Sequence, residues 1–155
     1  MKELVNEVVR INAPASVVWD FISDIEHCAT WLTNVDSVSI LKRGDNGLVG
    51  LRWEETRKMF GKEATETMWI TRAEPLNFYQ VEAHNHGAKY FSKLSIQVKP
   101  GGCELAMSFS AKAVSFSAKL SSLLMAPLMK SSVKKMVARD LSDIKHAAEQ
   151  QAEAA

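Results

Sequence analysis

The spacing of hydrophobic residues changes along the chain and divides it into a strand-rich part and a helical part. From residue 117 to the C-terminus there is no glycine and only one proline, and apolar residues recur mostly three or four positions apart, at Leu120, Leu124, Met129, Val133, Met136, Val137, Leu141 and Ile144. This spacing predicts one long amphipathic helix with a continuous apolar stripe. The stripe is lost after residue 147, so we expect one domain over residues 1–147 and a frayed tail over residues 148–155.

Ahead of this helix, alternating apolar and polar residues predict a series of strands. The pattern favours seven strands, over residues 4–12, 35–43, 48–59, 62–73, 78–83, 89–99 and 103–113. The last strand alternates most clearly, with Leu105, Met107 and Phe109 on one face. Two short helices follow the first strand: Pro14 suits the first turn of one, and the other ends near Leu32. Short hairpin connections predict an α+β fold in which a bent, seven-stranded antiparallel sheet is closed by the long helix.

Composition and charge exclude several classes of protein. The 155 residues suit one domain, and contents of 46% hydrophobic and 24% charged residues are ordinary for a globular protein. A net charge of +1, from 19 basic and 18 acidic residues, argues against nucleic acid as a partner. Cys28 and Cys103 belong to no CxxC or Cys/His cluster, so we expect reduced thiols in a cytoplasmic protein. The N-terminus runs directly into a strand pattern, and no apolar stretch reaches transmembrane length.

The order of elements resembles the START-like helix-grip superfamily, also called SRPBCC. The resemblance covers essentially the whole chain, and it is carried by residues 11–20, Trp31, Val49-Gly50, Pro75, Gly101-Gly102 and residues 140–145. This superfamily includes the birch-pollen allergen and the polyketide cyclase/dehydrase and lipid-transport family. The resemblance implies a curved sheet wrapped around the C-terminal helix, with a cavity between them. Because its members include carriers, cyclases, coenzyme Q-binding proteins and chaperone activators, it does not by itself specify an activity.

Aromatic and methionine side chains are the main candidates for the wall of such a cavity. Unbranched thioethers and aromatic rings adapt to apolar ligands, although the same residues also fill ordinary cores. The predicted ligand-binding residues are Leu51, Trp53, Glu55, Trp69, Tyr79, Tyr90, Met107, Phe109, Leu124, Met129 and Val133. Trp69 depends most on the phase of its strand, because Met68 and Ile70 compete for the inward face. Glu55 or Tyr90 is expected to orient the ligand.

Few residues suggest catalysis. If Glu55 faces inward, Arg57 or Arg72 must compensate its charge, and it is the one candidate for acid/base chemistry; alternatively, these charges lie at the rim or in solvent. His84 and His86 form either a metal pair or, as we favour, a solvated turn. His27 and Cys28 are neighbours on a predicted helix and face different directions, which argues against a nucleophile and its base. No phosphate-binding loop, dinucleotide motif or zinc spacing occurs, so we expect no cofactor and no metal.

The segment of residues 117–129 has apolar residues around much of its circumference and contains Pro127. It forms either a hinged lid or plain packing under the loops or in a homodimer, so both a monomer and a homodimer are open. The flanking lysines, Lys119 and Lys130 among them, favour transient contact with anionic lipid.

The sequence therefore favours a non-enzymatic protein that binds a hydrophobic small molecule, namely a lipid, an isoprenoid quinone or a polyketide-like aromatic. One alternative is a polyketide cyclase or dehydratase that acts in the same cavity without a cofactor. The other is a START-like protein-interaction module, which should expose an apolar patch instead of a deep void.

Overall fold

A computed structural model describes residues 1–59, 61–85 and 87–155, apart from the side chains of residues 59 and 116–129. The elements are β1 (Lys2–Ile11), α1 (Ala15–Ser23), the 3-10 helix η1 (Ile25–Thr30), β2 (Val35–Lys42), β3 (Arg52–Met59), β4 (Lys62–Glu74), β5 (Phe78–Asn85), β6 (Ala88–Lys99), β7 (Gly102–Ala113) and α2 (Phe116–Ala154). This order confirms the predicted α+β helix-grip fold, with two short helices between the first and second strands.

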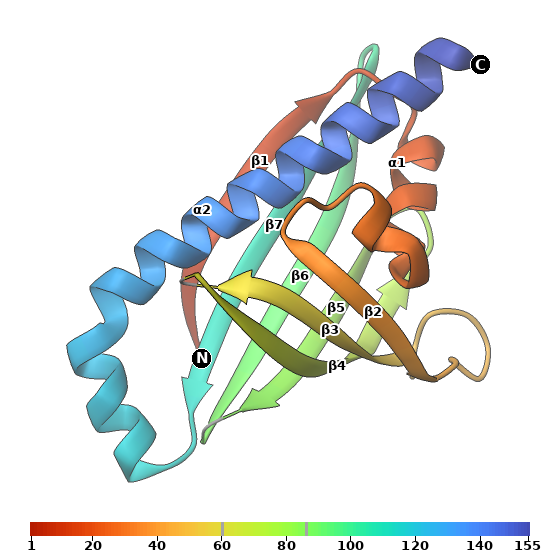
Figure 1. Cartoon of the computed structure of the whole chain (residues 1–155). Helices are drawn as coiled ribbons and strands as arrows, with labels where there is room; N and C mark the ends of the chain where they lie inside the picture. The colour runs from red at the N-terminus through yellow and green to blue at the C-terminus, as the bar shows by residue number, and fades with distance from the viewer. Residues whose placement is uncertain (60, 86) are drawn as a thin grey trace.

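The seven strands form one antiparallel sheet in the order β1-β7-β6-β5-β4-β3-β2. Every pair except β1–β7 joins strands that are consecutive in sequence, whereas β1 pairs with the last strand, for example Val9 opposite Leu105. The sheet curves strongly, and α2 runs diagonally across it, while α1 and η1 lie near the C-terminal half of α2 (Figure 1). The space between sheet and helix is therefore bounded by α1 and η1 as well.

The apolar stripe of α2 packs against the sheet along most of its described length. The stripe residues Val133, Val137, Leu141 and Ile144 are all buried. The prediction of a frayed tail is wrong, because α2 continues to Ala154 and Ala148 is completely buried. Glu149 also fastens this end of the helix, since its carboxylate accepts hydrogen bonds from the backbone N–H of Asn12 and from Lys145.

Two connections differ in detail from the sequence-based expectation. The third strand begins at Arg52 instead of residue 48, because residues 43–51 form a longer loop with left-handed glycines at Gly47 and Gly50. The seventh strand begins at Gly102 instead of residue 103, and Gly102 packs so closely against β1 that an added Cβ would lie 2.2 Å from the carbonyl oxygen of Ile11. Only glycine fits there, which gives a physical reason for the Gly101-Gly102 turn.

The segment of residues 117–129 belongs to the N-terminal part of α2, which continues through Pro127 without a break and bends in Figure 1. The side chains of Leu124 and Met129 lie outside the described residues, so their contact with a ligand stays a prediction. The same holds for the lid and for contact of this segment with lipid. In the part of the chain that the structure describes, no helix is long and apolar enough to cross a membrane.

Candidate functional site

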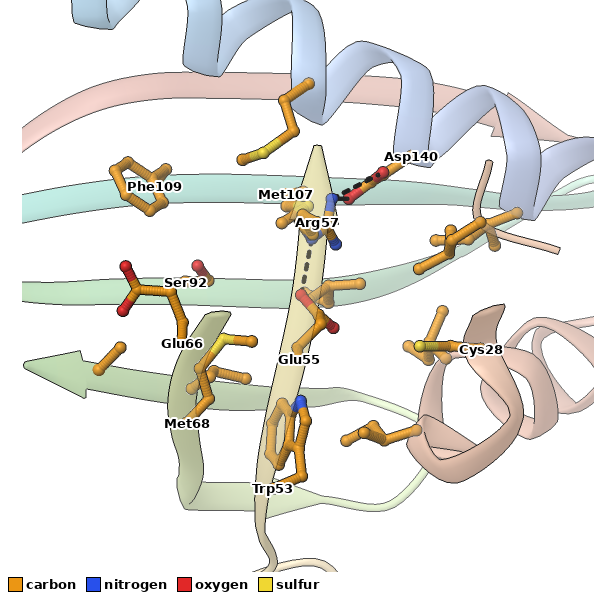
Figure 2. Close-up of a pocket in the computed structure, with 18 of the residues that line it drawn as sticks. Cys28, Trp53, Glu55, Arg57, Glu66, Met68, Ser92, Met107, Phe109 and Asp140 are labelled. Atoms are coloured by element: carbon orange, nitrogen blue, oxygen red, sulfur yellow. Dashed lines mark hydrogen bonds and ion pairs between the residues drawn. The ribbon is translucent and has the colours of Figure 1, made fainter. Parts of the chain in front are cut away.

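A cavity of about 250 Å³ lies between the concave face of the sheet and α2. Strands β3 to β7 form its floor, α2 forms its roof, and α1, η1 and the turn after η1 close one end. Most of the lining is apolar (Figure 2). The interior thus has the character of a small-molecule site, with a largely apolar wall and a few polar groups.

Strand alternation explains which side chains reach this cavity. On β7, Met107 and Phe109 face inward as the sequence predicts, and Leu105 lies fully buried on the same face. Seven of the predicted ligand-binding residues lie on the wall: Trp53, Glu55, Tyr79, Tyr90, Met107, Phe109 and Val133. Leu51 is buried in the core but does not line the cavity. The binding role of these residues stays a prediction.

The expectation that Trp69 faces the cavity is wrong. Met68 takes the inward position on β4, and Ile70 is buried on the same face. The Trp69 ring lies on the opposite face of the sheet. There it meets the imidazole of His84 edge-on, with 4.9 Å between the ring centroids, and the guanidinium of Arg52 lies over it. The sequence pattern misplaced the indole because Met68, Trp69 and Ile70 are three successive apolar residues, so alternation does not fix the phase of β4 there.

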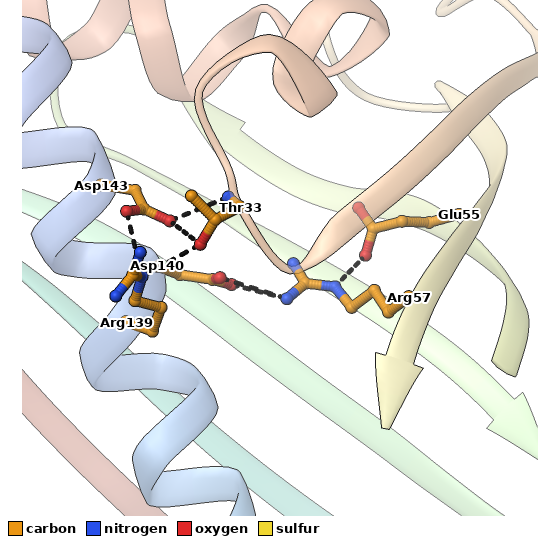
Figure 3. A network of polar contacts seen from close by, with 6 residues as sticks. All are labelled: Thr33, Glu55, Arg57, Arg139, Asp140 and Asp143. Atoms are coloured by element: carbon orange, nitrogen blue, oxygen red, sulfur yellow. Dashed lines mark hydrogen bonds and ion pairs between the residues drawn. The ribbon is translucent and has the colours of Figure 1, made fainter. Parts of the chain in front are cut away.

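A buried charged network crosses the cavity from the sheet to the helix. Arg57 on β3 donates from Nε to Oε2 of Glu55 at 2.6 Å, and its Nη1 lies 2.9 and 3.2 Å from the two carboxylate oxygens of Asp140 on α2 (Figures 2 and 3). Glu55 is 7% exposed and Asp140 only 1%. Of the two partners expected for Glu55, Arg57 is therefore correct. Arg72 instead lies over the ring of Phe78.

This burial also decides between the two alternatives for Glu55: it lies inside the protein and not in solvent. A single guanidinium faces two carboxylates, so the fully ionised network carries one negative charge. Burial raises the pKa of Asp140 to about 6, although Arg57 acts in the opposite direction. Burial alone would lower the pKa of Arg57, but Asp140 and Glu55 together raise it above its ordinary value. Arg57 is thus charged at any physiological pH, whereas Asp140 titrates close to neutrality.

The role of Asp140 was not identified from the sequence, although a signal was present. Asp140 is three positions after Val137 and seven after Val133, so it occupies a place in the apolar stripe of α2. A carboxylate on the buried face of a helix requires a cationic partner. Its partner, however, lies 83 positions earlier on another element, and strand and helix register together are needed to find it.

A third carboxylate lines the cavity beside the first. Glu66 on β4 pairs in register directly opposite Glu55, and both side chains point inward. Glu66 accepts a hydrogen bond from the side-chain amide of Asn85 at 2.6 Å, which does not neutralise its charge. Like charges on directly opposed residues repel each other, so this pair makes the interior electrostatically negative.

The two tyrosines play different parts. The hydroxyl of Tyr79 donates to the carbonyl of Ile22 at 2.7 Å, so it fastens α1 to the sheet and contributes only its ring to the cavity. Tyr90 stacks on Phe109 with 5.8 Å between the ring centroids. Burial, followed by the charge of Glu66, raises the pKa of Tyr90, which keeps its hydroxyl protonated.

A second set of polar contacts fixes α2 to the turn before β2. Asp143 accepts hydrogen bonds from both the backbone N–H and the hydroxyl of Thr33, at 2.9 Å each (Figure 3). Arg139 donates to the same hydroxyl at 3.0 Å and pairs with Asp143 at 3.3 Å. These contacts fix the position of α2 relative to the turn that closes one end of the cavity.

The other chemical candidates do not form reactive sites. His27 pairs with Asp24 at 2.8 Å in an exposed position, whereas the neighbouring Cys28 is buried in the cavity wall. His84 pairs with Glu82 at 2.7 Å, and His86 lies outside the described residues. Among residues 1–59, 61–85 and 87–155, no group of three or more His, Cys, Asp or Glu is arranged to hold a metal ion. The expected lack of a metal or cofactor stays a prediction.

Replacing Arg57 by methionine leaves two carboxylates buried without a cation. We expect Arg57→Met to lower the free energy of unfolding at pH 7 by about 3–5 kcal/mol, measured by urea denaturation. The matched control is Arg72→Met on the other face of the sheet, where loss of the contact with Phe78 should cost no more than about 1 kcal/mol. Equal effects of the two substitutions would contradict the central role of Arg57.

The pKa of Asp140 predicts a pH dependence of stability. The folded protein retains the Asp140 proton up to about pH 6, whereas the unfolded chain releases it near 3.8, so this group favours the folded state at low pH. From pH 4 to pH 7, the free energy of unfolding of the wild type should therefore fall by about 2 kcal/mol relative to Asp140→Asn. Urea denaturation at several pH values measures this difference. A difference that stays constant with pH would refute the assignment.

Cys28 should be chemically inert. Burial first, and then the charge of Glu55, raises the pKa of the Cys28 thiol to about 12, so almost none of it is the reactive thiolate at pH 8. We expect iodoacetamide to alkylate Cys28 at least about 100-fold more slowly in the folded protein than in urea, as followed by peptide mass spectrometry. Comparable rates in the two states would mean that the thiol is accessible and activated.

Comparison with known proteins agrees with this geometry. No curated protein matches the sequence. Among solved structures, the di-domain ARO/CYC BexL from the BE-7585A biosynthetic pathway is similar, with a TM-score of 0.78 and 16% sequence identity. The similarity covers 94% of this chain but only 49% of the BexL chain. The Zhui aromatase/cyclase from Streptomyces sp. R1128 has a TM-score of 0.77 and 17% identity, over 95% of this chain and 93% of Zhui.

A START superfamily protein from Mycobacterium smegmatis is also similar, with a TM-score of 0.69 and 17% identity over 99% of both chains. At these identities the structures show a shared fold. Residues 3–149 match the family described as polyketide cyclase / dehydrase and lipid transport. The protein is thus a member of the polyketide cyclase/dehydrase and lipid transport family.

Proposed function

We propose that this protein binds a compact, neutral and mainly hydrophobic small molecule between its sheet and α2. The observation that carries this proposal is the cavity itself, an apolar space of about 250 Å³ with a few polar groups in its wall. A protein-interaction module would need no such interior. Aromatic and thioether side chains from several elements converge on it, as in binding sites for small apolar ligands.

The volume favours a compact ligand. Sites for drug-sized ligands usually have volumes of about 300–1,000 Å³, and this cavity lies just below that range. A small aromatic molecule fits such a space better than a long isoprenoid chain or a two-chain lipid. Of the three ligand classes considered from the sequence, a polyketide-like aromatic is therefore the best match, and the family and its aromatase/cyclase neighbours support this choice.

The charges favour a neutral ligand. Three carboxylates line the cavity, those of Glu55, Glu66 and Asp140, and Arg57 is the only cation on the described part of the wall. An anionic group inside would face this excess of negative charge in a poorly solvated space. Fatty acids and phosphorylated lipids are thus poor candidates.

A cyclase or dehydratase is the second candidate, and one observation favours it. Asp140 has a pKa of about 6 and lies at the cavity wall, so it is able to hold or release a proton near neutral pH. Arg57 Nη2 has no hydrogen-bond partner among the described residues and is free to polarise a ligand carbonyl. Catalysis would proceed by positioning and proton transfer, with no cofactor.

A pair of probes of similar size tests the proposed binding. We expect 2-naphthol to bind with one-to-one stoichiometry in isothermal titration calorimetry, and 2-naphthoate to bind at least about tenfold more weakly because its carboxylate meets the acidic wall. Met107→Trp should fill the cavity and abolish binding. The control Val98→Trp changes a residue that is 73% exposed and should leave binding intact.

The outcomes of this experiment are distinct. Failure of 2-naphthol to bind, or binding that survives Met107→Trp, would contradict the proposed site. Equal affinities for the two probes would contradict the preference for neutral ligands. Native mass spectrometry of the purified protein would then separate carrier from enzyme, because a dehydratase converts an added polyketide substrate with loss of one water, whereas a carrier releases it unchanged.

A further inference from the structure

The indole N–H of Trp53 is a buried donor without an acceptor. Trp53 lies on β3, is 3% exposed and belongs to the cavity wall. Its Nε1 is the one buried side-chain nitrogen or oxygen atom among the described residues that has no hydrogen-bond partner. Buried polar groups are nearly always paired, because an unsatisfied donor costs about 1–3 kcal/mol of desolvation free energy. The orphaned N–H therefore needs an explanation beyond packing.

An acceptor with spare capacity lies on the same strand. Glu55 follows Trp53 by two positions, so both side chains project from the same face of β3 into the cavity. Figure 2 shows the indole nitrogen on the edge of the ring nearest to Glu55. Only one carboxylate oxygen of Glu55, Oε2, is bonded to Arg57, and Oε1 receives no hydrogen bond from the described residues. A donor and an acceptor without partners among the described residues thus point into the same cavity from one strand.

One functional group satisfies both atoms. A hydroxyl accepts one hydrogen bond and donates another, and two bonds of about 2.8 Å bridge a gap of up to about 5.6 Å. A carbonyl oxygen accepts from the indole but is repelled by the carboxylate. An ammonium group donates to the carboxylate but offers nothing to the indole N–H. The pair is therefore selective for a hydroxyl.

We propose that Trp53 and Glu55 form a binding site for a hydroxyl group of the ligand, a phenol or an alcohol. The hydroxyl oxygen accepts a hydrogen bond from Trp53 Nε1, and the hydroxyl O–H donates a hydrogen bond to Glu55 Oε1. This inference rests on the proposed function and adds the chemical group that the ligand must carry. Sites with buried polar partners reject analogues that lack the matching group, because the partners are then left unpaired.

The surrounding charges strengthen the donation to Glu55. Arg57 holds the position of Glu55 through its other oxygen, so Oε1 is presented in a fixed orientation. Glu66, directly opposite on β4, adds negative potential at the same place. A hydrogen bond to a carboxylate is stronger than one between neutral groups, so most of the selectivity is expected from this half of the site.

The test compares 2-naphthol with 2-methylnaphthalene, which has nearly the same shape but lacks the hydroxyl. Affinities are measured by calorimetry for the wild type, for Trp53→Phe and for the control Trp69→Phe, which changes the tryptophan on the other face of the sheet. We expect the affinity ratio of 2-naphthol to 2-methylnaphthalene to fall about tenfold in Trp53→Phe and to stay unchanged in Trp69→Phe.

A second measurement does not depend on the folding of a variant. The chain has four tryptophans, so the wild type gives up to four indole N–H signals in a nitrogen-resolved NMR spectrum. The signal of Trp53 should move downfield with 2-naphthol, which accepts its hydrogen bond, and not with 2-methylnaphthalene, which exerts a similar ring-current effect.

The outcomes separate this inference from the proposed function. If both probes bind, but the ratio is the same in Trp53→Phe and the Trp53 signal responds equally to both, the hydroxyl site is overturned and the binding cavity remains. If neither probe binds the wild type, the proposed cavity function is overturned together with the hydroxyl site.

Discussion

One buried guanidinium links the two layers of the fold through the interior of the cavity. Arg57 extends from β3 and contacts carboxylates on its own strand and on α2, so it joins the sheet to the helix. The helix does not fill the concave face of the sheet, and a cavity of about 250 Å³ stays between them. The charged network spans that space at one point, while the rest of the wall is apolar. The three side chains of this network therefore both connect the two layers and form part of the cavity wall.

Most of the architecture was predictable because it depends on local patterns. Period-two alternation identified the strands, the spacing of three and four identified α2, and the inward phase of β7 followed from Met107 and Phe109. Trp69 was assigned to the wrong face because it lies between two other apolar residues, Met68 and Ile70, and the guanidinium of Arg52 stabilises the indole on the outer face. Composition cannot resolve the phase of such a strand.

The polar part of the site was less predictable because its members are distant in sequence. Glu55 and Arg57 share a strand face, so their pairing follows from alternation, but the contact with Asp140 requires the register of α2 against the sheet. The orphaned nitrogen of Trp53 is visible only when all neighbouring acceptors are placed. The extent of α2 also depended on a tertiary contact, since Glu149 is fastened by the backbone of Asn12.

The pairing of β1 with β7 has a consequence for biosynthesis. Of the seven strands of this sheet, β1 is synthesised first, and its neighbour β7 begins only about ninety residues later, at Gly102. Throughout that interval the nascent chain presents unpaired edges at both ends of the growing sheet, a state prone to association with other chains. The sheet therefore closes only after all seven strands have been synthesised, and a folding rate limited by this long-range pairing is the expected outcome of the topology.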